Sequence, residues 1–371
     1  MLKLPVRVSH RDPHRRGWLR GAPPPRWVRV LPVLLVVAVC VATLVSPSRL
    51  DIGFLLGAIP PLAVLSYGPL ATALLGSAVV VLLSVPAFGL DHPGNTDLET
   101  VGFVALLSVF LSFVRSRRDA QLDLERTVAE AAQRAVLPPL PERVGPVCCA
   151  GLYRAAQRGT LVGGDFFDVR QGPRGVRAVM GDVQGHGLAA VSTVAALLGA
   201  FREAVLDRPD VTAVAGALDR RLVMDSAEVR HAELFATAAL LEFSADARSV
   251  RMVTCGHPPP ILLRDGAATE IGVAPWTPLG LGLSEGAPHP DGHTVPLRPG
   301  DVLFLASDGV TEARGPGGEF YPLLDRLPPL AGGAPAALAD RVLADLLSYC
   351  GSVNDDVTML VLTPCPPPKG E

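Results

Sequence analysis

Lysine is almost absent from this chain of 371 residues, in which arginine carries nearly all of the positive charge. The formal net charge is −3, which excludes a generally basic protein that binds nucleic acid through its phosphates. None of the six cysteines lies in a CxxC pair or in a Cys/His spacing typical of a zinc site. We therefore expect reduced thiols in a cytoplasmic setting, without a disulfide framework and without nucleic acid as a partner.

Charged residues are missing from long stretches of the N-terminal third. None lies within 30–48, 52–90 or 100–114. A membrane-spanning helix needs roughly 20 apolar residues. The sequence therefore predicts an all-α transmembrane domain over 30–114, with four helices at 30–48, 52–67, 70–89 and 98–114. Tyr67-Gly68-Pro69 separates the second helix from the third. A signal peptide is the alternative for the first segment, but the later apolar segments and the long basic lead-in argue against it.

Arginine is unevenly distributed around these segments. It is frequent before the first (Arg7, Arg11, Arg15, Arg16, Arg20, Arg26 and Arg29) and directly after the fourth (Arg115, Arg117 and Arg118). The loop over 91–99 is acidic instead. The positive-inside rule then places both termini in the cytoplasm, as an even number of spans requires. We expect a multi-pass protein of the cell membrane, surrounded by lipid, with a basic cytoplasmic tail over 1–29.

A linker is predicted over 115–140. Apolar residues recur at roughly helical spacing over 119–136, and Pro138-Pro139 ends the pattern. The helix is too short for sustained heptads, so pairing in a homodimer and service as a spacer both stay open. Apart from Glu99 at the start of the fourth, the predicted spans carry no charged residue, which argues against an ion pathway and leaves an anchor or a sensor.

Carboxylates grouped with glycine distinguish the C-terminal part. They lie in four motifs: Gly163-Gly164-Asp165-Phe166-Phe167-Asp168, Gly181-Asp182-Val183-Gln184-Gly185-His186-Gly187, Ser307-Asp308-Gly309 and Asn354-Asp355-Asp356-Val357-Thr358. Several follow strand-like runs such as 176–180 and 302–306, so they can converge at strand ends. Converging carboxylates repel one another unless a hard cation such as Mg²⁺ or Mn²⁺ holds them. Because paired ions of this kind attack phosphate esters, the motifs predict a metal-dependent phosphoryl hydrolase.

These motifs, in this order and together with Cys255-Gly256-His257-Pro258-Pro259-Pro260, resemble the SpoIIE-like branch of the PPM family of metal-dependent protein serine/threonine phosphatases. The similarity covers roughly 132–362. It implies an αββα sandwich, here over 141–365, two Mn²⁺ or Mg²⁺ ions, and phosphoserine or phosphothreonine substrates. The expected fold class is therefore α+β, with the sandwich preceded by the four-helix membrane segment.

The resemblance also assigns roles to individual residues. It implies that four aspartates bind the ions and act in catalysis through a metal-activated water: Asp165, Asp182, Asp308 and Asp355. Asp182 is the expected bridge between the ions, and the carbonyl of Val183 is an additional ligand. Three further residues are candidates for contacts around the ligands: Asp168, His186 and Asp356. His186 is also a candidate general acid for the leaving alkoxide, although a structural role in its loop is favoured. His257 is interpreted as part of a turn.

Two other functions are compatible with parts of the sequence. The run Gly163–Phe167 is reminiscent of the GG(D/E)EF signature of diguanylate cyclases, but Phe166 stands where that signature needs Glu. We therefore expect a membrane-anchored phosphatase of a cytoplasmic phosphoprotein, for which the resemblance suggests an anti-sigma-factor antagonist. The alternative is a catalytically weak, membrane-anchored pseudophosphatase that acts as a binding scaffold in signalling.

Overall fold

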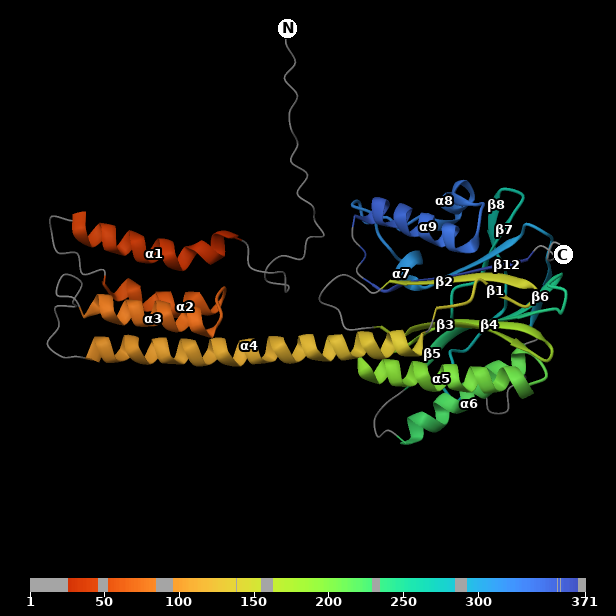
Figure 1. Ribbon diagram of the computed structural model, residues 1–371, viewed down its shortest axis with the longest axis horizontal. Coiled ribbons are helices and arrows are strands. Elements are labelled where there is room, and N and C mark those ends of the chain that lie inside the picture. Colours follow the sequence, from red (N-terminus) through yellow and green to blue (C-terminus); the bar gives the residue numbers. More distant parts are fainter. Residues whose placement is uncertain are drawn as a thin grey trace, which may run out of the picture. The chain divides into compact units, whose positions relative to one another are not determined.

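The computed structural model describes residues 26–45, 53–84, 96–137, 139–154, 163–228, 234–283, 292–351, 353 and 355–365. They fall into two compact units, divided between Leu124 and Glu125. Each unit is described by itself (Figure 1). Most of the predicted basic tail, the loop over 85–95 and Asn354 lie outside the described residues.

The N-terminal unit is helical where the sequence predicts helices. Its elements are α1 (Arg26–Val45), the 3-10 helix η2 (Gly53–Ala58), α2 (Ile59–Val64), α3 (Pro69–Leu83) and the first part of α4 (Thr96–Val136). The chain breaks at Gly68-Pro69 as expected, because proline fits the first turn of a helix but cannot continue the preceding one. The helix α4 continues without interruption through the predicted linker and ends at Val136, just before the Pro138-Pro139 pair.

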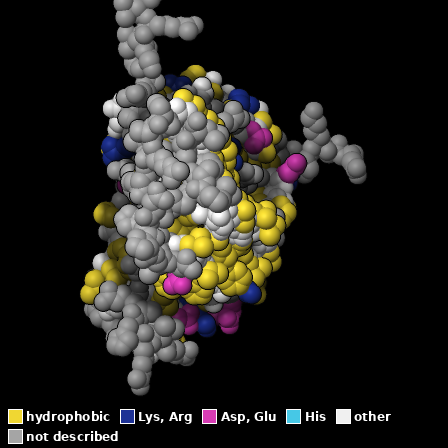
Figure 2. All heavy atoms as spheres, turned by 90° about the vertical axis from the view of Figure 1, so that its left-hand side faces the viewer, with side chains coloured by type: hydrophobic (Ala, Val, Ile, Leu, Met, Phe, Trp, Pro, Cys, Tyr) yellow, Lys and Arg dark blue, Asp and Glu magenta, His cyan; other side chains and the backbone are white. Residues whose placement is uncertain are grey.

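Many large apolar side chains lie on the outside of this unit, and hydroxyl-bearing side chains lie between its helices beside a buried apolar cluster that includes Leu56 and Ile59. Phe103, Leu106 and Phe110 are exposed by 67, 72 and 61%. Inside, Thr72 Oγ1 of α3 lies 3.5 Å from Ser112 Oγ of α4. Figure 2 shows hydrophobic side chains gathered over the face that this end of the protein presents. This arrangement reverses the usual distribution of a water-soluble protein.

Two helices of the described residues are long and apolar enough to cross a membrane, Leu98–Glu125 within α4 and Leu188–Asp207. The second is α5, which packs against β3, β4 and α6 inside the C-terminal unit and is therefore a core helix. The other apolar helices of the N-terminal unit are shorter: Trp27–Ala42, Leu55–Val64 and Pro69–Leu83. The predicted four-span topology thus receives support in one helix and stays a prediction for the rest.

Two β-sheets packed face to face form the centre of the C-terminal unit. In the described residues one sheet has the order β1-β2-β12-β11-β7-β8, and the other has the order β10-β6-β5-β4-β3, with β9 beside β6. Their bounds are β1 Arg143–Val144, β2 Val147–Arg154, β3 Asp165–Gly172, β4 Gly175–Val183, β5 Ala236–Phe243, β6 Ser249–Cys255, β7 Ile261–Arg264, β8 Ala267–Glu270, β9 Pro275–Trp276, β10 His293–Pro296, β11 Val302–Ala306 and β12 Val357–Pro364.

Helices cover both outer faces of this sandwich (Figure 1). Against the second sheet lie α5 (Leu188–Asp207) and α6 (Val211–Glu228). Against the first lie α8 (Leu323–Leu330) and α9 (Pro335–Cys350), and the single turn α7 (Asp308–Thr311) follows β11. The predicted α+β class and αββα layering are confirmed. Successive side chains of a strand point to opposite faces, so Phe167 enters the core between the sheets and Phe166 packs under α5 and α6.

The cysteine expectation is wrong for one pair. Cys148 and Cys365 form a disulfide across a sequence separation of 217 residues. Cys148 lies in β2, and Cys365 directly follows β12, the antiparallel neighbour of β2. The remaining cysteines (Cys40, Cys149, Cys255 and Cys350) are free thiols. Local spacing cannot reveal such a pair, because only the pairing of two distant strands brings its partners together.

Candidate active site

The predicted ligands come from both sheets and meet at one edge of the sandwich. Asp165 opens β3, and in the ladder it lies directly opposite Asp182 of β4. Asp308 opens α7 immediately after β11, and Asp355 precedes β12. The two sheets are joined here by Thr358 of β12, whose hydroxyl donates a hydrogen bond to Asp165 Oδ2. Strand ends 193 residues apart are thereby brought together.

Burial and neighbouring carboxylates shift the pKa of three of these aspartates. Burial, followed by repulsion from Asp182, holds the pKa of Asp165 well above its usual range. Burial, followed by repulsion from Asp308 and Asp355, raises the pKa of Asp182 to about 7. Burial and then Asp355 also raise the pKa of Asp308. A carboxylate whose charge is opposed by several others is a strong attractor for a cation, and such perturbation is typical of functional sites.

Glycine is required beside these groups because the backbone passes very close to them. A Cβ at Gly164 would lie 2.1 Å from the carbonyl oxygen of Val183 and 2.8 Å from Asp182 Oδ1. A Cβ at Gly309 would lie 1.8 Å from the carbonyl oxygen of Asp356. Both glycines therefore leave room that any side chain would fill. The Val183 carbonyl lies next to the Asp182 carboxylate, as expected for an additional ligand.

Asp356 is held in place by the protein itself. Its side chain is 6% exposed and accepts hydrogen bonds from Tyr153 Oη at 2.7 Å and from the Gly163 amide at 2.9 Å. It also contributes to the raised pKa of Asp165. Asp356 thus lies against the ligand set, where it was predicted. Tyr153 was not predicted, because only the pairing of β2 with β12 places it beside this loop.

Asp168 is not brought to the site. It lies on the face of β3 that is turned away from Asp165, and there it forms ion pairs with Arg202 of α5 at 2.7 Å and with Arg170 at 2.9 Å. The physical reason is the alternation of side chains along a strand, by which residues three apart face opposite ways. Its role as a contact of the ligands finds no support in this geometry.

The two histidines differ sharply in environment. His186 lies exposed in the loop before α5, and its side chain has no hydrogen bond to any described residue. His257 is buried, with Nδ1 3.3 Å from Thr237 Oγ1, and burial lowers its pKa to about 4. A neutral, enclosed imidazole fits the interpretation of His257 as part of a turn.

The donor set suits a hard divalent cation. Carboxylate and carbonyl oxygens are the ligands that Mg²⁺ and Mn²⁺ prefer, and the cluster offers four carboxylates (Asp165, Asp182, Asp308 and Asp355) and one carbonyl (Val183). In the part of the chain that is described, no three acidic, His or Cys side chains are yet arranged tightly enough to enclose an ion. Mutual repulsion keeps such carboxylates apart, so binding would require small side-chain movements.

Comparison with known proteins agrees with this site. The family model described as stage II sporulation protein E, SpoIIE, matches residues 172–364, more than half of the chain. The chain belongs to the SpoIIE family. Membership confirms the predicted SpoIIE-like protein phosphatase of the PP2C, or PPM, type. The matched residues include Asp182, Asp308 and Asp355, whereas Asp165 lies just before them.

Solved structures of similar fold include domains from two bacteria. The structure of the RsbU and RsbW domains of Rv1364c from Mycobacterium tuberculosis is 27% identical, with a TM-score of 0.50, and the match covers 62% of this chain and 64% of that one. The SiaA-PP2C domain of Pseudomonas aeruginosa is 23% identical, with a TM-score of 0.53, and the match covers 66% of this chain and 98% of that one. The match thus spans less than two thirds of the length of the first structure.

Proposed function

We propose that the protein is a membrane-anchored, metal-dependent phosphatase that removes phosphate from serine or threonine of a cytoplasmic phosphoprotein. The observation that carries the proposal is the meeting of Asp165, Asp182, Asp308 and Asp355 from two sheets, where burial and repulsion between carboxylates raise the pKa of the first three. Two Mn²⁺ or Mg²⁺ ions bound there would lower the pKa of a water and offset the charge of a phosphoryl group. The scaffold alternative has no observation in its favour.

The chain's own residues would orient the ligands. Thr358 fixes one oxygen of Asp165 by hydrogen bonding, and the Asp356–Gly163 contact fixes the loop that leads into β3. Gly164 and Gly309 let the backbone approach the ligands from both sheets. Prealigned oxygens of this kind reduce the reorganisation needed when ions and phosphate bind.

The substrate follows from the family resemblance, which suggests a phosphorylated anti-sigma-factor antagonist. The test is release of phosphate from phosphoserine peptides, and from the phosphoprotein that accumulates when the chain is deleted. We expect release by the full-length protein with Mn²⁺ or Mg²⁺ and none with EDTA. Equal release with and without the chelator would contradict the proposal.

Anchoring in the membrane is supported by the exposed apolar side chains of the N-terminal unit and by the flanking arginines. Both termini and the phosphatase domain would lie in the cytoplasm. Reporter fusions at Glu371 and within the loop over 91–99 should therefore give opposite signals. A C-terminal reporter outside the cell would contradict the topology.

Pairing of two copies through α4 is the proposed quaternary arrangement. Leu124 and Val128, one helical turn apart, are exposed by 65 and 46%, and two copies could cover this stripe. Cysteine introduced in place of Leu124 should crosslink between copies in the full-length protein. Cysteine in place of exposed Leu206 of α5 is the matched control, and equal crosslinking of both variants would argue for random collision.

A further inference from the structure

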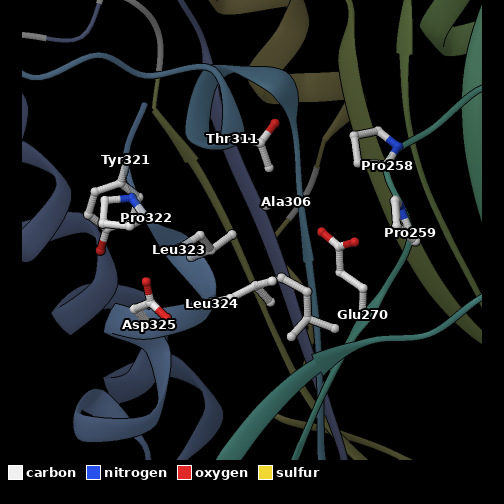
Figure 3. Close-up of a pocket in the computed structure, with 11 residues that line it drawn as sticks. Pro258, Pro259, Glu270, Ala306, Thr311, Tyr321, Pro322, Leu323, Leu324 and Asp325 are labelled. Carbon is white, nitrogen blue, oxygen red and sulfur yellow. The ribbon is translucent and has the colours of Figure 1, made fainter. Parts of the chain in front are cut away.

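A pocket of about 350 Å³ opens between the proline turn after β6 and the start of α8 (Figure 3). Its apolar walls include Ile261 of β7 and Leu323 of α8, and Pro258 and Pro259 form one rim. The prolines of the Cys255–Pro260 motif therefore line this pocket and are not part of the cluster of ligand aspartates. Its volume lies at the lower end of the range of about 300–1,000 Å³ typical of ligand sites.

Each rim of the pocket is connected to one of the predicted ligand aspartates. Thr311, which lines one rim, belongs to the same single turn of helix as Asp308. Residues three apart on a helix have Cβ atoms about 5–6 Å apart. On the other rim, Pro258 follows His257, which contacts Thr237, and Thr237 lies opposite Asp182 in the ladder of β4 and β5. A substrate held at the cluster would therefore extend over this pocket.

Two carboxylates make the pocket negative. Glu270 of β8 and Asp325 of α8 line it, and the Glu270 carboxylate turns toward its centre (Figure 3). Neither side chain forms an ion pair with any described residue. The neighbouring arginines are engaged elsewhere: Arg326 binds both oxygens of Asp345, and Arg314 donates to the carbonyl of Gly318.

We propose that this pocket binds an arginine or lysine side chain of the phosphoprotein substrate, two or three residues from the phosphoserine. The aliphatic stem would lie along Ile261 and Leu323, and the cationic head would reach Glu270, while Asp325 on the opposite wall adds negative charge. An extended segment advances about 3.3 Å per residue, so two or three residues bridge from the cluster to the pocket. This inference rests on the proposed phosphatase function and names the class of sequence that the site prefers.

The test measures kcat and KM of the full-length protein on phosphoserine peptides that differ only in the position of one arginine within an alanine background. Each value is normalised to the rate of the same protein with phenyl phosphate. We expect arginine at one position to raise kcat/KM about five- to tenfold, mainly through a lower KM, because a partly exposed charge pair is of modest strength. Glu270→Gln should reduce this preference to about twofold or less, the range of a weak exposed pair.

Two variants complete the design. Asp325→Asn should weaken the same preference, whereas Asp340→Asn, an equal charge change at an exposed position of α9, should retain it. Glu270→Arg should favour a peptide with glutamate in place of arginine. Turnover without any arginine preference, or a preference unaffected by both Glu270 variants, would overturn this inference alone. Absence of turnover with every ester would overturn the phosphatase proposal, and this inference with it.

Discussion

The two units of the protein are both rich in apolar residues but distribute them in opposite ways. In the C-terminal unit Phe166, Leu240 and Phe304 are at most 1% exposed, whereas in the N-terminal unit Phe103 and Leu106 are largely exposed. Soluble proteins rarely expose large contiguous apolar patches. Small and hydroxyl residues between helices are typical of membrane proteins. The proposed anchoring of the N-terminal unit in the membrane accounts for this contrast.

Buried polar groups separate the units further. Those between α3 and α4 are neutral hydroxyls such as Ser108, which donates to its own helix backbone. Those of the C-terminal unit include charged side chains, such as Asp165, Asp168 and Arg177. The ion pair between Arg177 and Glu242 is structural, because each charge has its partner. Asp165 and Asp182 instead face other carboxylates, and buried charge of this kind is retained for function.

The largest effect is expected from removing a ligand charge. Asp182→Asn and Asp308→Asn should lower kcat by about 10²–10³-fold or more, the cost of deleting one electrostatic contact to the reacting group. Asp340→Asn, an exposed aspartate of α9, is the matched control. Phosphate release by the full-length variants measures the effect, and wild-type activity of both would refute the ligand assignment.

Asp168→Asn should affect stability and not chemistry. The change removes the charge that pairs with Arg202 and Arg170, which are themselves partly exposed, and should cost about 1–3 kcal/mol of unfolding free energy. Thermal or denaturant unfolding measures this loss, and kcat of the folded variant should stay within a few-fold of wild type. A loss of Mn²⁺ binding without loss of stability would place Asp168 at the ions after all.

The apolar exterior of the N-terminal unit can be tested by a charge. Leu106→Arg, near the middle of the long apolar helix, should disfavour membrane insertion by about 2.5 kcal/mol. The fraction of protein recovered in membranes should fall, whereas Leu124→Arg, next to the arginine-rich flank, should leave it unchanged. Equal recovery of both variants would argue that this face does not contact lipid.

A smaller effect concerns pH. Because the pKa of Asp182 is raised to about 7, this carboxyl holds a proton at lower pH that a cation must displace. Metal affinity should therefore rise with pH and fall up to about tenfold per pH unit below about 7. Calorimetry in buffers of different ionisation enthalpy should detect proton release on Mn²⁺ binding. Equal affinity at pH 6 and pH 8 would contradict this coupling.

The sequence predicted the layered fold and the meeting of the four aspartates because short motifs that group aspartate with glycine, repeated in order, leave a strong local signal. It named Asp165 as a ligand and Asp168 as a contact of the ligands, but it could not show that Asp168 faces away from the cluster, since the two phenylalanines between them are both buried, one on each face of the sheet. The pattern of apolar residues along this strand therefore did not show which face of the sheet each side chain lies on.

Long-range pairing explains what the sequence missed. Tyr153 reaches Asp356, and Cys148 reaches Cys365, only because β2 lies beside β12. No local sequence pattern shows that these two strands are neighbours in the sheet. The N-terminal unit shows the opposite limit, since its apolar composition predicts helices there but does not by itself establish whether or how many of them cross a bilayer.

Counting bound ions addresses most directly whether the two sheets together form a metal site. Titration of the full-length protein with Mn²⁺, followed by electron paramagnetic resonance, should show two ions per chain in the wild type and in Asp168→Asn. Asp182→Asn should lose both ions if that residue bridges them. Binding of two ions by Asp182→Asn with wild-type affinity, or no binding of Mn²⁺ by the wild type, would contradict a metal site at this edge of the sandwich.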